Sequence, residues 1–140
     1  MLGGLYEVKA SGGETGGTAT VMEMTIPEGI GPPPHIHDGA EATYVLEGSA
    51  RYQIDSRTVD VGPGTFLHFP QGTLETFEPQ GQVKLLIFYA PGGIDKFFEE
   101  AGEPAASREL PSPPEGPPDV ERLVEIGSCH GVELRAPETV

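Results

Sequence analysis

Turn-forming residues interrupt this chain at short, regular intervals. The 140 residues include 20 glycines and 15 prolines, and up to residue 90 a turn signal recurs about every eight to twelve residues. Between these signals lie short runs in which apolar and polar residues alternate, such as residues 19–26 and 83–89. Such alternation is typical of strands with one buried face. We therefore predict about eight or nine short strands in an antiparallel sandwich or barrel.

The turn dipeptides also predict which strands are neighbours. The predicted strands are residues 5–9, 19–26, 35–37, 41–46, 50–54, 57–61, 65–69, 73–77 and 83–89. The turn Asp38-Gly39 predicts a hairpin between His35–His37 and the strand that starts at Glu41, and Gly48 is expected to end that strand. We expect aromatic and aliphatic strand residues to form the core and the walls of a pocket. They are Tyr44, Tyr52, Phe66, Phe77, Leu85, Ile87 and Tyr89.

Beyond residue 90 the pattern changes from strands to helices. Residues 94–101 place apolar side chains at helical spacing, with Gly102 as a stop. Residues 103–118 hold six prolines and predict an irregular connection. Asp119 can then cap a second helix, over residues 120 to about 129. We predict one domain, residues 1–140, with a barrel core at about 5–90 and a C-terminal helical extension at about 91–140.

Charge and composition exclude several classes of partner. The formal net charge of −14 would repel a nucleic acid backbone. No run of apolar residues is long enough for a membrane span, and no targeting segment is recognisable. Cys129 is the single cysteine, so an internal disulfide cannot form, and a cytoplasmic location is expected. The chain also has no tryptophan or asparagine, a composition that resembles that of heat-adapted proteins.

Two histidines and a glutamate form the most informative cluster. His35 and His37 are two residues apart on a predicted strand, so their imidazoles face the same side. The turn at Asp38-Gly39 lets Glu41 enter the same space from the next strand. Two imidazoles and one carboxylate can form a facial metal site with open positions for water, substrate or dioxygen.

The spacing around this cluster resembles the first motif of the cupin superfamily. That motif is a glycine, five residues, His-x-His, three or four residues, Glu, six residues and a glycine, and Gly29, His35, His37, Glu41 and Gly48 supply every element. The second cupin motif is recognisable at residues 64–75, although Glu75 occupies the position of its histidine ligand. Residues 91–101 resemble quercetin 2,3-dioxygenase-like single-domain cupins.

The resemblance implies a small all-β fold, an antiparallel double-stranded β-helix or jelly-roll barrel, followed here by two short helices. It also implies one divalent ion, which the sequence does not identify among Mn, Fe, Ni and Zn, and a pocket for a small organic molecule. The leading activity is that of a metal-dependent dioxygenase on a quercetin-like or related substrate. The alternatives are a non-catalytic binder or sensor, and an isomerase.

Three roles for Glu75 stay open. It is a fourth metal ligand beside His35, His37 and Glu41, a catalytic base above a three-residue site, or a residue that faces outward. His68 also has two interpretations, because it either points into the barrel and supplies an imidazole or is an exposed strand residue. Unpaired strand edges and outer apolar residues such as Phe88 predict a homodimer.

Overall fold

The computed structural model describes residues 3–114 and 116–135, and most of the elements in this part of the chain are strands. In chain order the elements are β1 (Leu5–Ala10), β2 (Thr20–Ile26), β3 (His35–His37), β4 (Ala40–Ile54), β5 (Arg57–Val61), β6 (Phe66–Phe69), β7 (Leu74–Ala90), α1 (Asp95–Ala101), α2 (Val120–Cys129) and β8 (Val132–Leu134). All strand pairs are antiparallel. The predicted all-β fold with two short helices is confirmed.

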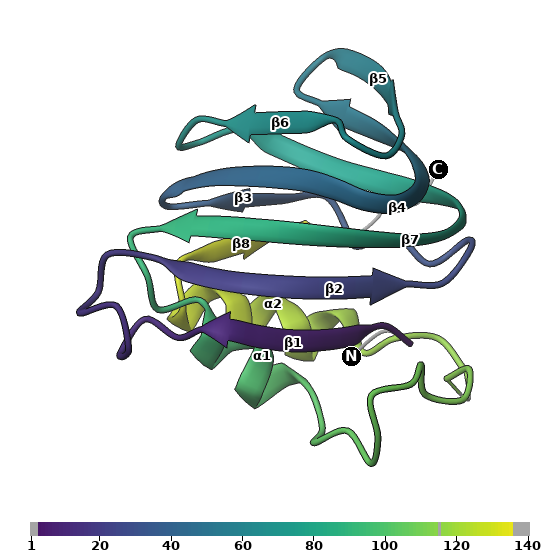
Figure 1. Cartoon of the computed structure of the whole chain (residues 1–140). Coiled ribbons are helices and arrows are strands. Elements are labelled where there is room, and N and C mark those ends of the chain that lie inside the picture. Colours follow the sequence, from purple (N-terminus) through teal and green to yellow (C-terminus); the bar gives the residue numbers. More distant parts are fainter. Residues whose placement is uncertain (1–2, 115, 136–140) are drawn as a thin grey trace.

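The two longest strands, β4 and β7, organise the sheet. They pair with each other from Ala40 and Ala90 at one end to Ile54 and Glu75 at the other. The C-terminal half of β7 also pairs with β2, whereas its first residues pair with β3. β4 pairs in addition with β5 and β6. Figure 1 shows the result as one strongly curled sheet, and this curling encloses the site.

Glycines bend β4 and β7 without ending them, which corrects the prediction of separate shorter strands. The register between the two strands shifts on both sides of Glu47, next to Gly48. Gly48 has a φ of 78° and Gly81 a φ of 80°, a region that glycine enters without steric cost. A Cβ at Gly48 would also lie 2.1 Å from the Gln82 carbonyl oxygen. These glycines therefore mark bulges at a corner of the sheet.

The predicted hairpin between β3 and β4 is wrong. β3 pairs with β7 on one edge, where His35 is opposite Glu75, and with β8 on its other edge, where His37 is opposite Val132. The backbone N–H of Asp38 donates to the Gly131 carbonyl oxygen at 2.9 Å. The turn is thus attached to the C-terminal part of the chain and does not close a hairpin. The sequence did not predict β8.

Both helices form close to where the sequence predicts them. Asp119 caps α2, because its side chain accepts a hydrogen bond from the Arg122 backbone N–H at 3.1 Å. The parts of the 103–118 connection that are described contain no helix or strand. Figure 1 shows α1 and α2 beside β1 and β8, at one side of the curled sheet. Among the described residues, no helix has the length and apolar character needed to cross a membrane.

The core lies inside the curled sheet, and two predicted members are absent from it. Tyr52, Leu85, Ile87 and Tyr89 are buried, and Phe77 is partly buried. Tyr44 and Phe66, however, are 40% and 62% exposed. They are opposite each other in the β4–β6 pair, so both side chains project from the outer face of the sheet.

Candidate metal centre

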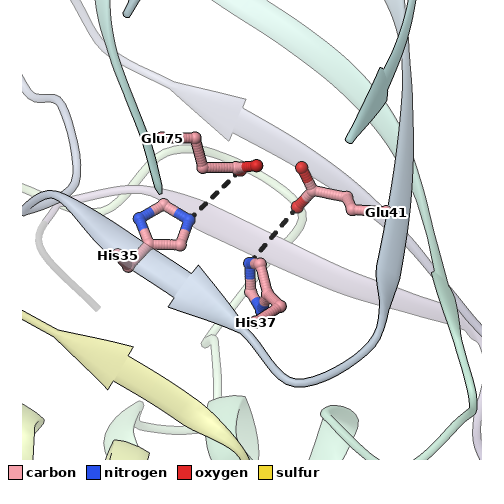
Figure 2. A group of neighbouring side chains, drawn as sticks. All are labelled: His35, His37, Glu41 and Glu75. Carbon is pink, nitrogen blue, oxygen red and sulfur yellow. Dashed lines mark ion pairs between the residues drawn. The ribbon is translucent and has the colours of Figure 1, made fainter. Parts of the chain in front are cut away.

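Four side chains that can bind a metal ion converge inside the barrel. They are His35 and His37 of β3, Glu41 near the start of β4 and Glu75 near the start of β7 (Figure 2). Each offers one ligand atom, and these atoms all lie within 4.8 Å of one another. The four residues are between 4% and 9% exposed. The structure thus brings together the four residues that the sequence proposed as metal ligands.

Strand geometry explains how these residues meet. The alternation of side chains along β3 places both histidines on the inner face. Glu75 is the cross-strand partner of His35, so the two side chains are neighbours on that face. Glu41 follows the turn after His37 and is held between β6 and β7, opposite Phe69 and Tyr89. The site thus draws on three strands of the sheet.

His35 is oriented by its own backbone. Its Nδ1–H donates to the Pro33 carbonyl oxygen at 2.9 Å, because a carbonyl can only accept. The tautomer that this bond selects leaves a lone pair on Nε2, which lies 3.2 Å from Glu75 Oε1. Burial and the neighbouring His37 lower the pKa of His35 to about 4. A neutral imidazole with a free Nε2 is the form that binds metal ions.

His37 has an unusual lack of partners for a buried side chain. Its Nε2 is 3.5 Å from Glu41 Oε1, which is long for a hydrogen bond, and neither ring nitrogen has a hydrogen-bond partner among the described residues. Glu75 Oε2 also lacks one. A buried polar atom without a partner costs about 1–3 kcal/mol. Unpaired buried atoms of two residues in a cluster with one ligand atom from each of its four members within 4.8 Å fit a bound cation.

The two carboxylates differ in their readiness to ionise. Burial, followed by the charge of Glu41 and a hydrogen bond with it, raises the pKa of Glu75 to about 11. Burial would also raise the pKa of Glu41, but interactions with His37 and Glu75 hold it below its ordinary value. Without a cation the pair therefore keeps one proton, on Glu75. A divalent cation would replace that proton and balance two negative charges.

A small cavity adjoins the cluster. Its volume is about 70 Å³, and its walls are mainly apolar side chains of the barrel and of the C-terminal segment. Thr43, two residues after Glu41 on the same face of β4, also lines the cavity. Its hydroxyl is buried without a hydrogen-bond partner in the described structure. Thr43 was not predicted from the sequence, although its two-residue spacing from Glu41 is a signal for this position.

His68 does not belong to the site. It lies on β6, where the burial pattern places Phe69 inside and His68 outside. Of the two interpretations of His68, the exposed strand histidine is the one that the structure confirms. The expectation that Phe66, of the same parity, points inward is wrong for the same reason.

Comparison with known proteins points to one family. Residues 22–89 match the family described as cupin domain. Quercetin 2,3-dioxygenase from Bacillus subtilis (strain 168) is 27% identical to this chain over 113 residues, which are 79% of this chain and 34% of that protein. This chain therefore spans about a third of the length of that curated relative.

Solved structures agree with this match. KdgF from Halomonas sp. superposes with a TM-score of 0.62 and 15% identity, over 69% of this chain and 87% of that one. Oxalate decarboxylase from Bacillus subtilis superposes with a TM-score of 0.59 and 26% identity, over 64% of this chain and 25% of that one. The polyketide cyclase RemF from Streptomyces resistomycificus has a TM-score of 0.57 and 24% identity, over 63% of this chain and 65% of that one.

Proposed function

Since this chain is a member of the cupin superfamily, we propose that its barrel binds one divalent metal ion and a small organic molecule beside it. The ligands to the ion would be His35, His37, Glu41 and Glu75. The observation that carries this proposal is the convergence of four buried ligand atoms within 4.8 Å, together with atoms of His37 and Glu75 that have no hydrogen-bond partner among the described residues. Two imidazoles with two carboxylate oxygens suit Mn(II) or Fe(II), although Ni(II) and Zn(II) also accept such ligands.

The leading reaction is oxidative cleavage of the organic molecule by dioxygen. A bound ion of this kind would supply Lewis acidity and, for Fe or Mn, electron exchange with dioxygen. The chain itself contributes a neutral His35, fixed by Pro33, and a cavity with mainly apolar walls. The similarity to a quercetin 2,3-dioxygenase supports this reaction class. The resemblance implies a quercetin-like or related substrate, whereas the volume of the cavity favours a smaller molecule.

Glu75 has two candidate roles in this site. As a ligand it completes the four-residue set and gives up its proton when the ion binds. As a general base it would remain near the ion without binding it and would accept a proton from the organic molecule. Its position 3.2 Å from His35 Nε2 and its high pKa in the metal-free protein are compatible with both roles.

A non-catalytic binder is the second candidate function. The small volume of the cavity favours it, because a site of about 70 Å³ leaves little room for an organic molecule together with dioxygen. Oxygen consumption with a panel of small organic acids and phenols separates the two candidates. Saturable binding without oxygen consumption, with the ligand recovered chemically unchanged, would identify the chain as a binder.

Metal analysis tests the site directly. We expect the protein, purified without a metal-affinity tag, to contain about one divalent ion per chain. His37→Ala should lose it and keep a cooperative unfolding transition, because the core consists of apolar side chains. His68→Ala is the matched control, since this histidine is exposed on β6. A full equivalent of metal in His37→Ala would show that the assigned ligands are wrong.

Two substitutions then separate the roles of Glu75. If it is a ligand, Glu75→His restores the usual histidine of the second cupin motif and should preserve metal binding, with a preference for nickel or copper. If it is a base, Glu75→Gln should keep the metal and lose turnover, because the amide cannot accept a proton. Metal content and turnover equal to wild type in both variants would exclude both roles.

We also propose that the protein is a cytoplasmic homodimer. A single cysteine, Cys129, supports a location where disulfides are not needed. Outer apolar residues of the barrel support the dimer. Tyr44, Phe66 and Phe88 are each at least 40% exposed and lie on the adjoining strands β4, β6 and β7.

A further inference from the structure

We propose that the C-terminal segment of this chain sets an upper limit on ligand size, so that the site accepts only compact molecules smaller than one benzene ring. This inference rests on the proposed small-molecule site and names the class of ligand that it takes. It excludes a flavonol such as quercetin, although a quercetin 2,3-dioxygenase is among the relatives of this chain.

The volume of the cavity is the first evidence for a limit on ligand size. It is about 70 Å³, whereas a protein cavity that holds one benzene has a volume of about 150 Å³. The cavity also includes the space between the four ligand residues, and part of that space would belong to the ion. What remains suits a molecule of a few non-hydrogen atoms, far smaller than the three rings of a flavonol.

Part of the cavity wall comes from the C-terminal segment, and its strand β8 lies directly beside the histidines of β3. Phe98 of α1, Leu123 of α2, and Val132 and Leu134 of β8 all line the cavity. Strands β1, β2, β3, β4 and β7, with the loop before β3, provide the rest of the wall. Without α1, α2 and β8 the cavity would therefore be wider.

Contacts at several points hold this wall in place. The Phe98 ring stacks on Tyr6 of β1 with 5.3 Å between the ring centroids. Arg122 of α2 donates to the Glu100 carbonyl oxygen at 3.0 Å, and His130 Nε2 lies 2.7 Å from Glu100 Oε2, so α1 and α2 are joined at both ends of α2. Pairing with β3 fixes β8. Enlarging the cavity would break packing and hydrogen bonds at several of these points.

The polarity of the cavity further defines the ligand. Apolar side chains form the wall from the C-terminal segment, whereas the ligand residues and the unpartnered Thr43 hydroxyl lie on the barrel side. A fitting molecule has a polar end, which binds the ion and accepts from Thr43, and a short apolar body. Short-chain carboxylic and hydroxamic acids have this chemistry.

Benzene tests the size limit without any metal, so this result is separate from the test of the metal site. The measurement is the midpoint of thermal unfolding of chelator-treated protein, with and without saturating benzene. We expect no shift for wild type. In Phe98→Ala the lost ring frees about the volume of benzene, and the midpoint should rise by about 3 °C or more. Leu134→Ala provides a second, smaller enlargement if Phe98→Ala does not fold.

Phe88→Ala is the matched control, because Phe88 is exposed on the outer face of β7. Benzene should not shift the midpoint of thermal unfolding of this variant. Benzene stabilisation of the wild type would overturn the size limit. If Phe98→Ala and Leu134→Ala both fold and benzene stabilises neither of them, the C-terminal segment does not set the size limit. Saturable binding of quercetin to the metal-loaded wild type, abolished in His37→Ala, would also overturn the proposal.

Discussion

Neutralising Glu75 should remove a large pH dependence from the stability of the metal-free protein. In the folded protein the pKa of Glu75 is raised to about 11, whereas the ordinary value, which applies to the unfolded chain, is 4.5. Between these values the folded protein holds a proton that the unfolded chain has released. The free energy of unfolding therefore falls as the pH rises. The contribution is complete below about pH 4.5 and is lost progressively up to about pH 11.

The size of the effect follows from the proton difference. One proton corresponds to about 1.4 kcal/mol per pH unit, so the free energy of unfolding should fall by about 3 kcal/mol from about pH 7 to about pH 9. His35 does not contribute to the slope between about pH 7 and about pH 9, because its pKa is 6.5 in the unfolded chain and about 4 in the folded protein. The raised pKa values of the buried tyrosines lie above this window.

Urea unfolding of chelator-treated protein at several pH values measures this slope. Glu75→Gln should show a much flatter dependence than the wild type, because the amide does not titrate. Glu78→Gln, which alters an exposed carboxylate on the same strand, should behave as the wild type does. Parallel curves for the wild type and Glu75→Gln over this range would refute the view that Glu75 is buried as an acid.

Three further predictions concern single features of the fold. Thr43→Val, which removes a buried hydroxyl without a partner, should raise the free energy of urea unfolding of the metal-free protein by about 1 kcal/mol, and a loss of stability would mean that the hydroxyl has a partner. Gly48→Ala should lower the free energy of urea unfolding by about 2 kcal/mol or more, since φ is positive and a backbone oxygen is 2.1 Å from the added Cβ. An unchanged free energy of unfolding would argue against the bulge. Sedimentation at micromolar concentration should detect a dimer that Phe88→Asp dissociates, whereas a wild-type monomer would contradict the prediction.

The sequence predicted the proximity of the four candidate ligands well because its signals are local. The His-x-His spacing places His35 and His37 on one face of a strand, whatever that strand pairs with. Glu75 follows from the second cupin motif in the same way. The alternation of burial along β6 was open to two interpretations from sequence, because Phe66 and His68 share one face and Leu67 and Phe69 the other. Only the pairing of Tyr44 with Phe66 on the outer surface settles which face is buried.

Pairing between distant segments was much harder to predict. Asp38-Gly39 has the chemistry of a hairpin turn, yet β3 pairs with β7 and β8, because the turn is bound to Gly131. Gly48 was interpreted as the end of a strand, since a glycine at a bulge and a glycine at a turn look alike in sequence. The three residues of β8 were too few for a period of alternation to be recognised.

The pairing of β3 with two strands has a consequence for folding during synthesis. This three-residue strand contacts β7 through two residue pairs, whereas all three of its residues pair with β8. Residues 132–134 leave the ribosome long after His35 and His37, so a nascent chain that already contains all four proposed metal ligands still lacks one hydrogen-bonded edge of β3. Closing so long a loop is slow compared with forming local contacts. Loading of the ion is therefore expected to follow release of these residues, which would protect the growing chain from capturing a metal prematurely.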